Sequence, residues 1–388
     1  MRRLTAVVLL GLACASPGMP PGGPPDVAAP QIVAIIPDSG TLGVSPKEVI
    51  FRFDEVVSER PTSATTLADL FLISPRDRTA DASWHRDAIG VRPSNGWRAN
   101  TPYTVIMLRG IADLRGNIRN TGASTFFSTG KTIPRTRLAG RVFDWVSGTP
   151  ANGALVESFI RPDSLHPYIA LVDSSGAFVI EHLPPSRYTV RAYLDRNKNF
   201  GIDPSEPWDS VSIDLTDSAA ATLLIFAHDS VPPRIRDVSA VDSVSLLVTF
   251  DRPVDPSQTL TAANFAVIGP DSVPVPIVSA GAALKDTTAR TVIPPLGALR
   301  PARPPIPSRR DTTAAKPVMP RPAPVSEAVI KLQRPLAPKT TYRVRAIGIR
   351  GLLGHTGDSE RAYTTPAAAP PPAPKPAVIP PAAPPATR

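Results

Sequence analysis

The chain has very little cysteine and few aromatic residues. Cys14 is the one cysteine among 388 residues, and phenylalanine, tryptophan and tyrosine together make up 6%. A single thiol cannot form an intramolecular disulfide, so every folded domain must be stable without one. Long stretches with the 3.6-residue spacing of an amphipathic helix are also missing, which excludes a helical bundle.

The motifs of the common catalytic and nucleotide-binding sites are absent as well. The sequence contains no G-x-S-x-G, no P-loop and no dinucleotide-binding fingerprint, and its five histidines have no metal-ligand spacing. Asp54 and Glu55 are adjacent, so in a strand they point to opposite faces and cannot act as a carboxylate pair. We therefore expect a protein that is not an enzyme.

Proline is abundant instead, with 49 residues, and it gathers in segments that cannot form a core. We expect a Pro/Gly tether at 15–30, a disordered insert at 285–325 and a Pro/Ala-rich tail at 367–388. The net charge is +9, and the insert alone holds eight Lys and Arg against two Asp. The folded remainder is close to neutral, which argues against nucleic-acid binding. The insert either contacts anionic lipid or envelope polymer through its charge, or it is a solvated spacer.

Residues 1–14 have the plan of a secretory signal peptide. Two arginines precede an apolar run that is too short to span a bilayer as a helix and is followed by small residues. The Leu-Gly-Leu-Ala segment before Cys14 resembles a relaxed bacterial lipobox, which implies that Cys14 is lipidated and becomes the mature N-terminus. Cleavage by an ordinary signal peptidase is the alternative. Ala15 stands where an aspartate would resemble an inner-membrane retention signal, so an outer-membrane or cell-surface location is expected.

Short apolar runs separated by Gly, Pro and Asn turns predict antiparallel strands from residue 31 onwards. Their pattern occurs twice in the same order, within 31–130 and within 232–366. The matching segments are 53–57 with 250–254, 99–105 with 338–344, 111–117 with 349–355, and 127–129 with 363–365. We therefore expect two copies of one sandwich, the second of which is interrupted by the insert.

The first copy resembles the SbsA-type bacterial Ig-like domain in its F-D-E-V-V, Y-T-V, D-L-R-G-N and F-S-T segments. The second copy departs from this pattern where Gly351 replaces Asp113 and His355 replaces Asn117. The resemblance implies an Ig-like fold for both copies and says little about activity, because such folds carry many functions.

Residues 136–228 resemble a carboxypeptidase-regulatory-like or Cna B-type sandwich. The resemblance rests on the G-R-V, D-S-S-G-A-F-V-I and L-P-P-S-R-Y-T-V segments, with Ser186 where a glycine is usual. Together, the three resemblances imply an all-β chain. It would consist of three tandem antiparallel β-sandwich domains, Ig-like or prealbumin-like, at 31–130, 136–228 and 232–366.

The stretch at 195–209, DRNKNFGIDPSEPWD, is the one segment with the spacing of a metal site. An EF-hand-like spacing makes six residues candidate calcium ligands: Asp195, Asn197, Asn199, Gly201 through its carbonyl, Asp203 and Glu206. Phe200 occupies position 6, where glycine would suit the turn because a positive φ is awkward for a bulky side chain. A polar turn between strands is the alternative, since Asp and Asn favour turns. A bound calcium would be structural and would stiffen the joint with the next module.

Three tryptophans, Trp84, Trp97 and Trp208, either contribute to a carbohydrate-binding platform or pack within the fold. The sequence as a whole favours a non-catalytic cell-envelope lipoprotein that acts as a modular structural or binding scaffold. An adhesin or carbohydrate-binding surface protein is the alternative. The expected partners are the membrane, through the lipid anchor, and envelope polymer or protein.

Overall fold

The computed structural model describes residues 25–77, 80–197, 199–283 and 321–367. Their regular structure is β-strand apart from two short 3-10 turns, which confirms the all-β class. The chain divides into two compact units, Met1–Pro134 and Arg135–Arg388. Within the described ranges, no helix is long and apolar enough to cross a membrane. The signal peptide with Cys14, most of the predicted tether and insert, and nearly all of the tail lie outside them.

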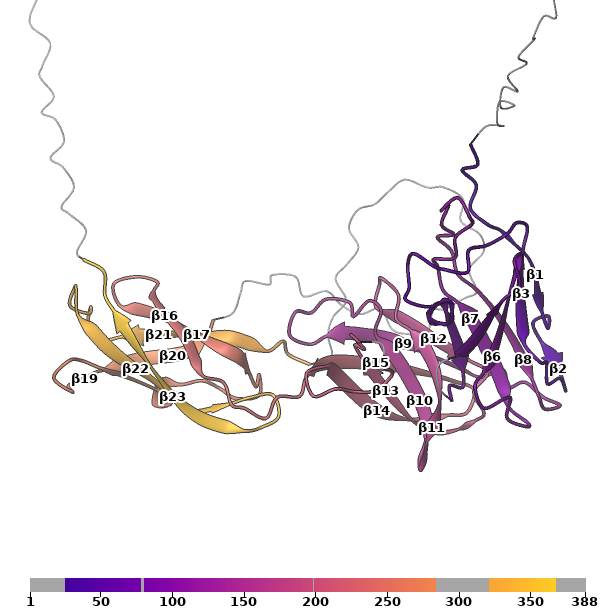
Figure 1. Cartoon of the computed structure of the whole chain (residues 1–388). Coiled ribbons are helices and arrows are strands. Elements are labelled where there is room, and N and C mark those ends of the chain that lie inside the picture. The colour runs from indigo at the N-terminus through magenta and orange to yellow at the C-terminus, as the bar shows by residue number, and fades with distance from the viewer. Residues whose placement is uncertain (1–24, 78–79, 198, 284–320, 368–388) are drawn as a thin grey trace, which may run out of the picture. The chain divides into compact units, whose positions relative to one another are not determined.

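The first unit is a sandwich of two four-stranded sheets, with strand orders β1-β3-β6-β5 and β2-β8-β7-β4 (Figure 1). Its elements are β1 Ile32–Ile36, β2 Thr41–Leu42, β3 Val49–Phe53, the 3-10 turn η1 Leu67–Leu70, β4 Phe71–Ser74, β5 Ala80–Trp84, β6 Ala88–Pro93, β7 Pro102–Met107 and β8 Ala123–Ser128. Alternation builds the core: in β3, Val49, Phe51 and Phe53 are buried while Arg52 is exposed.

The second unit begins with a seven-stranded arrangement in the order β11-β10-β13-β14-β15-β9-β12. Its strands are β9 Arg137–Asp144, β10 Leu155–Ile160, β11 Asp163–Leu171, β12 Ala177–Glu181, β13 Ser186–Tyr193, β14 Pro207–Leu215 and β15 Ser218–Ala227. β14 and β15 pair only through Pro207 with Ala227 and Trp208 with Phe226. The two layers that meet there enclose one core, to which both contribute side chains.

The pairing of β15 with β9 is parallel over eight residue pairs, although an antiparallel sandwich was expected. β2 and β8 of the first unit also pair in parallel. Parallel neighbours need a long crossover connection. In the middle sandwich this connection is the rest of the domain, because β9 is its first strand and β15 its last.

The last sandwich, also in the second unit, has sheets of order β16-β17-β21-β20 and β19-β18-β22-β23. Its elements are β16 Ile235–Ala240, β17 Ser245–Val254, the 3-10 turn η2 Ala262–Asn264, β18 Phe265–Ile268, β19 Pro274–Val275, β20 Ile277–Ala282, β21 Val325–Leu332, β22 Thr341–Arg350 and β23 Thr356–Thr364. β20 and β21 pair antiparallel. The chain between them therefore connects neighbouring strands of one sheet.

The first and last sandwiches repeat the same hydrogen bonds at matching residues. An aspartate accepts from a backbone N–H in each copy: Gln31 N donates to Asp54 Oδ1 and Arg234 N donates to Asp251 Oδ1, both at 2.8 Å. A tyrosine hydroxyl does the same, accepting from Arg98 N at Tyr103 (2.8 Å) and from Ala337 N at Tyr342 (2.9 Å). The third pair is Thr101 N to Thr129 Oγ1 (2.9 Å) and Thr340 N to Thr365 Oγ1 (3.0 Å). Each polar side chain in these pairs satisfies a backbone group where the chain enters or leaves a strand. The two copies thus share their sandwich closure, and their strand orders agree except at one edge: β2 pairs with β8 in the first copy, whereas β19 pairs with β18 in the last.

Gly140 in β9 lies where a side chain would collide with the core. A Cβ atom there would overlap the carbonyl oxygen of Ala221 and the ring of Phe178. We expect Gly140→Ala to lower the free energy of unfolding by about 1–3 kcal/mol in denaturant titrations of the full chain. Gly281→Ala in β20 is the control, because a Cβ there meets no atom within 4 Å. Equal effects of the two substitutions would contradict this packing.

Candidate functional site

The candidate calcium loop connects β13 to β14 in the middle sandwich. Leu194 N donates to the Pro207 carbonyl (3.1 Å), which closes the base of the loop next to the paired strands. Glu206, the last candidate ligand, is only 2% exposed at this base. The loop is therefore anchored at both ends by the sheet, as the sequence predicted from its position between two strands.

The two carboxylates at the ends of the spacing hold the loop backbone. Asp195 accepts hydrogen bonds from Asn199 N (3.1 Å) and Phe200 N (2.9 Å). Glu206 accepts from Arg196 N (2.8 Å) and from the N–H of Asp203 (3.1 Å). These bonds bend the chain around the two carboxylates and connect Asp195 to Asn199, and Glu206 to Asp203, within one loop.

The amide side chains lie inside the same loop. Asp203 Oδ2 accepts from Asn197 Nδ2 (2.6 Å) and Asn199 Nδ2 (3.3 Å), and Gly201 N donates to Asn199 Oδ1 (2.7 Å). A cation in this loop would need the amide oxygens of Asn197 and Asn199 to replace their nitrogens on the inner side. That rotation would break the bonds that these oxygens accept from Asn199 N (3.1 Å) and Gly201 N (2.7 Å). Hydrogen bonds thus link the six predicted residues within one loop, and oxygen ligands are those that calcium prefers. Among the described residues, however, the carboxylates of Asp195, Asp203 and Glu206 do not form a group whose oxygens all lie within 4.8 Å of one another.

Phe200 adopts the backbone conformation that the sequence made unfavourable for a bulky residue at position 6. Its φ is 58°, so position 6 does take the left-handed conformation for which glycine was expected. For a residue with a Cβ, this conformation costs roughly 1–2 kcal/mol. The two backbone bonds to Asp195, one of which Phe200 itself donates, hold the chain in this turn.

A second polar cluster lies in the first unit and was missed by the sequence reasoning. Carboxylate oxygens of Asp26, Glu55 and Asp113 lie within 4.8 Å of one another. Asp113 is 3% exposed and accepts from Arg115 N and Asn117 N (2.8 Å each), and the Asn117 amide donates to Asp113 Oδ2 (2.7 Å). Its members come from three separate segments, so no local motif marks them. The bonds show that Asp113 and Asn117 shape the turn between them.

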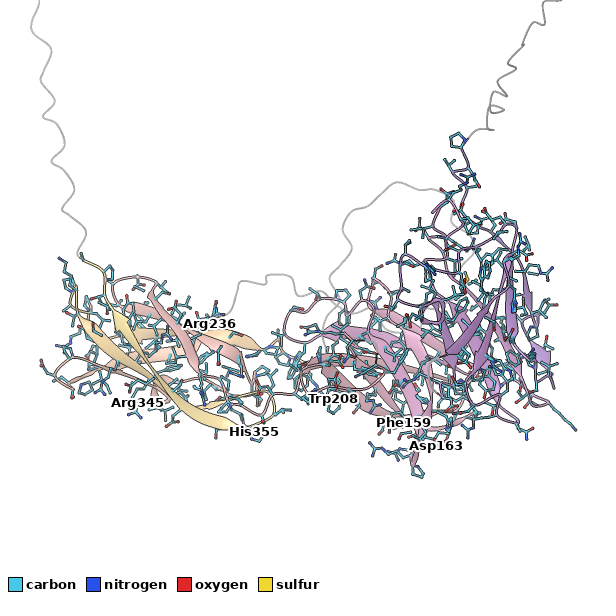
Figure 2. All side chains as sticks on the ribbon, in the orientation of Figure 1. Phe159, Asp163, Trp208, Arg236, Arg345 and His355 are labelled. Atoms are coloured by element: carbon cyan, nitrogen blue, oxygen red, sulfur yellow. The ribbon has the colours of Figure 1, made fainter. Side chains whose placement is uncertain are left out.

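The three tryptophans of the expected platform each have a partner within their own sandwich. Trp84 Nε1 donates to the Val57 carbonyl (2.9 Å), and Trp97 Nε1 donates to the Pro46 carbonyl (2.6 Å) from the edge of the core. Trp208, labelled in Figure 2, stacks on His228 with ring centroids 3.9 Å apart. These contacts favour packing over a shared sugar-binding surface.

Comparison with known proteins gives one family match. Residues 26–129 match the family model of the bacterial Ig-like domain. This supports the Ig-like prediction for the first sandwich and covers only that part of the chain. No curated protein matches.

Among solved structures, similarity is found to the N-terminal part of the bacterial S-layer protein SbsC, with 20% identity over 35% of this chain and a TM-score of 0.21. The match spans only 24% of that protein's chain. A DUF3823 family protein from Parabacteroides merdae is 15% identical over 36% of this chain and 66% of its own, with a TM-score of 0.19. The pilin subunit BcpA of Bacillus cereus is 6% identical over 49% and 67%, also with a TM-score of 0.19.

Replacing the buried carboxylate of the loop tests the calcium site. We expect isothermal titration calorimetry of the full chain to show calcium binding at millimolar metal or below, and Glu206→Gln to abolish it, because the bidentate ligand at position 12 is lost. Glu181→Gln, an exposed change in the same sandwich, should bind as the unchanged chain does. Thermal unfolding without metal shows whether the variant folds. An unchanged chain that releases no heat at millimolar calcium would exclude the site.

Glu55 is expected to destabilise the first unit at neutral pH. Burial, and then the negative charges of Asp113, Asp26 and Asp54, raise the pKa of its carboxyl. A carboxyl whose pKa is higher in the folded state favours folding below its unfolded pKa, and this contribution is lost as the pH rises through the folded pKa. Glu55→Gln should therefore raise the melting temperature at about pH 7 and lose this advantage near about pH 4.

The exposed Glu59 provides the matched control for this pH dependence. Glu59→Gln should change the melting temperature little at either pH, because its side chain is exposed and lies outside the group formed by Asp26, Glu55 and Asp113. A melting temperature that falls at neutral pH in Glu55→Gln would contradict the like-charge repulsion.

Proposed function

We propose that this protein is an exported, lipid-anchored scaffold of the bacterial cell envelope, with no catalytic role. Its sandwiches would act as spacers or as a binding support held at the membrane by a lipid on Cys14. An outer-membrane or cell-surface location follows from the residue after that cysteine, Ala15. The basic, proline-rich segment at 285–325 suits contact with anionic envelope polymer.

The observation that carries the proposal is the repeated hydrogen bonding of the first and last sandwiches. The polar residues that the copies share, such as Asp54 and Asp251, or Thr129 and Thr365, satisfy backbone groups in both. The copies therefore repeat the hydrogen bonds that stabilise the fold. Tandem copies of a self-contained sandwich supply length and attachment points, which is what a scaffold requires.

Structural calcium in the middle loop belongs to the same proposal. The loop leads directly into β14, and the second residue of β14, Trp208, pairs with Phe226 near the end of β15. The linker to the last sandwich follows β15. A cation bound by Asp195, Asp203 and Glu206 would thus stiffen the end of the middle sandwich from which the next module continues.

Substitution of the cysteine tests the anchor. In a bacterial host that processes lipoproteins, we expect the unchanged protein to enter the detergent phase of a Triton X-114 partition and Cys14→Ser to stay in the aqueous phase, because the thioether-linked lipid cannot form. Ser16→Ala should partition as the unchanged protein does. Membrane association that persists in Cys14→Ser would contradict lipidation at this residue.

Glycan arrays probed with the chain lacking its lipid separate the scaffold from the adhesin. A scaffold should give no glycan-specific signal. Specific binding that is lost in Trp84→Ala, the most exposed of the three candidate tryptophans at 36%, would establish the carbohydrate-binding alternative.

A further inference from the structure

The middle sandwich has a second, smaller apolar cluster besides its main core. Four buried side chains form it: Phe143, Trp145, Leu224 and Phe226. They come from β15 and from β9 with the residue after it, and they alternate with residues that face the main core, such as Val142 and Leu223. This cluster therefore lies on the outer side of β9 and β15. Leu352 of the last sandwich packs against it.

Trp145 makes two further contacts, with a segment far away in the sequence. Its indole Nε1 donates a hydrogen bond to the Pro322 carbonyl (3.0 Å). The guanidinium of Arg321 lies over its ring, 5.8 Å from the centroid. Trp145 itself is 7% exposed, while Arg321 and Pro322 are exposed, so the segment lies on the outside of the cluster.

The chemistry of these contacts is that of polyproline recognition. Proline has a fixed φ and no N–H, so a proline-rich segment is extended before it binds and presents carbonyls that need donors. An aromatic side chain with a donor, such as tryptophan, supplies both the donor and a flat apolar surface. An arginine next to the proline adds a cation–π contact with the same ring.

The sequence repeats the segment that occupies this surface. Arg-Pro-Ala occurs at 321–323 and again at 300–302, in a part of the chain rich in Arg and Pro. We propose that the Trp145 cluster is a docking site for extended arginine–proline segments, occupied in cis by Arg321–Pro322. The partner it fits is a proline-rich peptide with arginine before proline, and the resident segment competes with any such peptide at high effective concentration.

Vacating the site in the full chain makes it testable in trans. The variant lacks residues 318–323, which removes both the Arg321 guanidinium and the Pro322 carbonyl that contact Trp145. The probe is a fluorescein-labelled peptide with the sequence of residues 318–324, VMPRPAP. We expect the peptide to bind this variant at least about tenfold more tightly than the unchanged chain, in which the resident segment competes. Fluorescence anisotropy measures both affinities. Equal affinities, or no binding to either chain, would overturn the proposal.

Two further changes identify the contacts. Trp145→Phe in the vacated background keeps an aromatic ring and removes the donor, so peptide affinity should fall about tenfold or more. Trp84→Phe in the same background should leave it unchanged. A peptide with alanine in place of its arginine tests the cation–π contact without altering the protein, so its result holds even where Trp145→Phe misfolds. Undiminished binding of this peptide would contradict the arginine preference.

Discussion

Each sandwich is stabilised by the burial of alternating side chains between its paired sheets, because the sequence after Cys14 contains no cysteine that could form a disulfide. Each of the three sandwiches accordingly has its own large apolar cluster, to which both of its layers contribute. Filling both layers with apolar side chains leaves few places for polar groups inside a sandwich, and the buried Glu157 in β10 is paired with Arg191 and the Tyr193 hydroxyl. The candidate calcium loop and the Asp113 turn accordingly lie in connections, where their carboxylates accept hydrogen bonds from backbone N–H groups.

A buried tyrosine shows how this constraint works at the sandwich ends. Tyr103, Tyr188 and Tyr342 each place a ring in a core and a hydroxyl against the backbone four or five residues earlier. Tyr188 donates to the Pro184 carbonyl, whereas the other two accept from a backbone N–H. Burial raises the pKa of Tyr103 and of Tyr188, so these hydroxyls stay protonated. The same solution serves the first and last sandwiches and a middle sandwich of different strand order.

Local pattern predicted the parts of the structure that depend on local sequence. The sequence repeat matched Tyr103 of the first copy with Tyr342 of the second. The turn-forming residues at 195–206 indicated a loop between two strands. The parallel pairing of β9 with β15, the approach of Asp26 to Glu55 and Asp113, and the bond from Trp145 to Pro322 were not predictable in this way. They join segments whose separation in the chain leaves no periodic trace, and only the packing of whole layers brings them together.

The middle loop shows where propensity and tertiary structure conflict. Phenylalanine at position 6 opposes the left-handed turn, yet Phe200 adopts it, since Asp195 accepts two backbone bonds that only this turn aligns. Asp195 and Glu206 thus hold the loop backbone at its two ends. A calcium ion would have to bring the carboxylates closer together and to displace the contacts that the amides of Asn197 and Asn199 make with Asp203. The backbone bonds to Asp195 and Glu206 would favour calcium binding by holding the loop in place, whereas the amide contacts of Asn197 and Asn199 would oppose it. If the loop binds calcium as proposed, its affinity would depend on how readily Asn197 and Asn199 turn their oxygens inward, because Phe200 already has the positive φ of the turn.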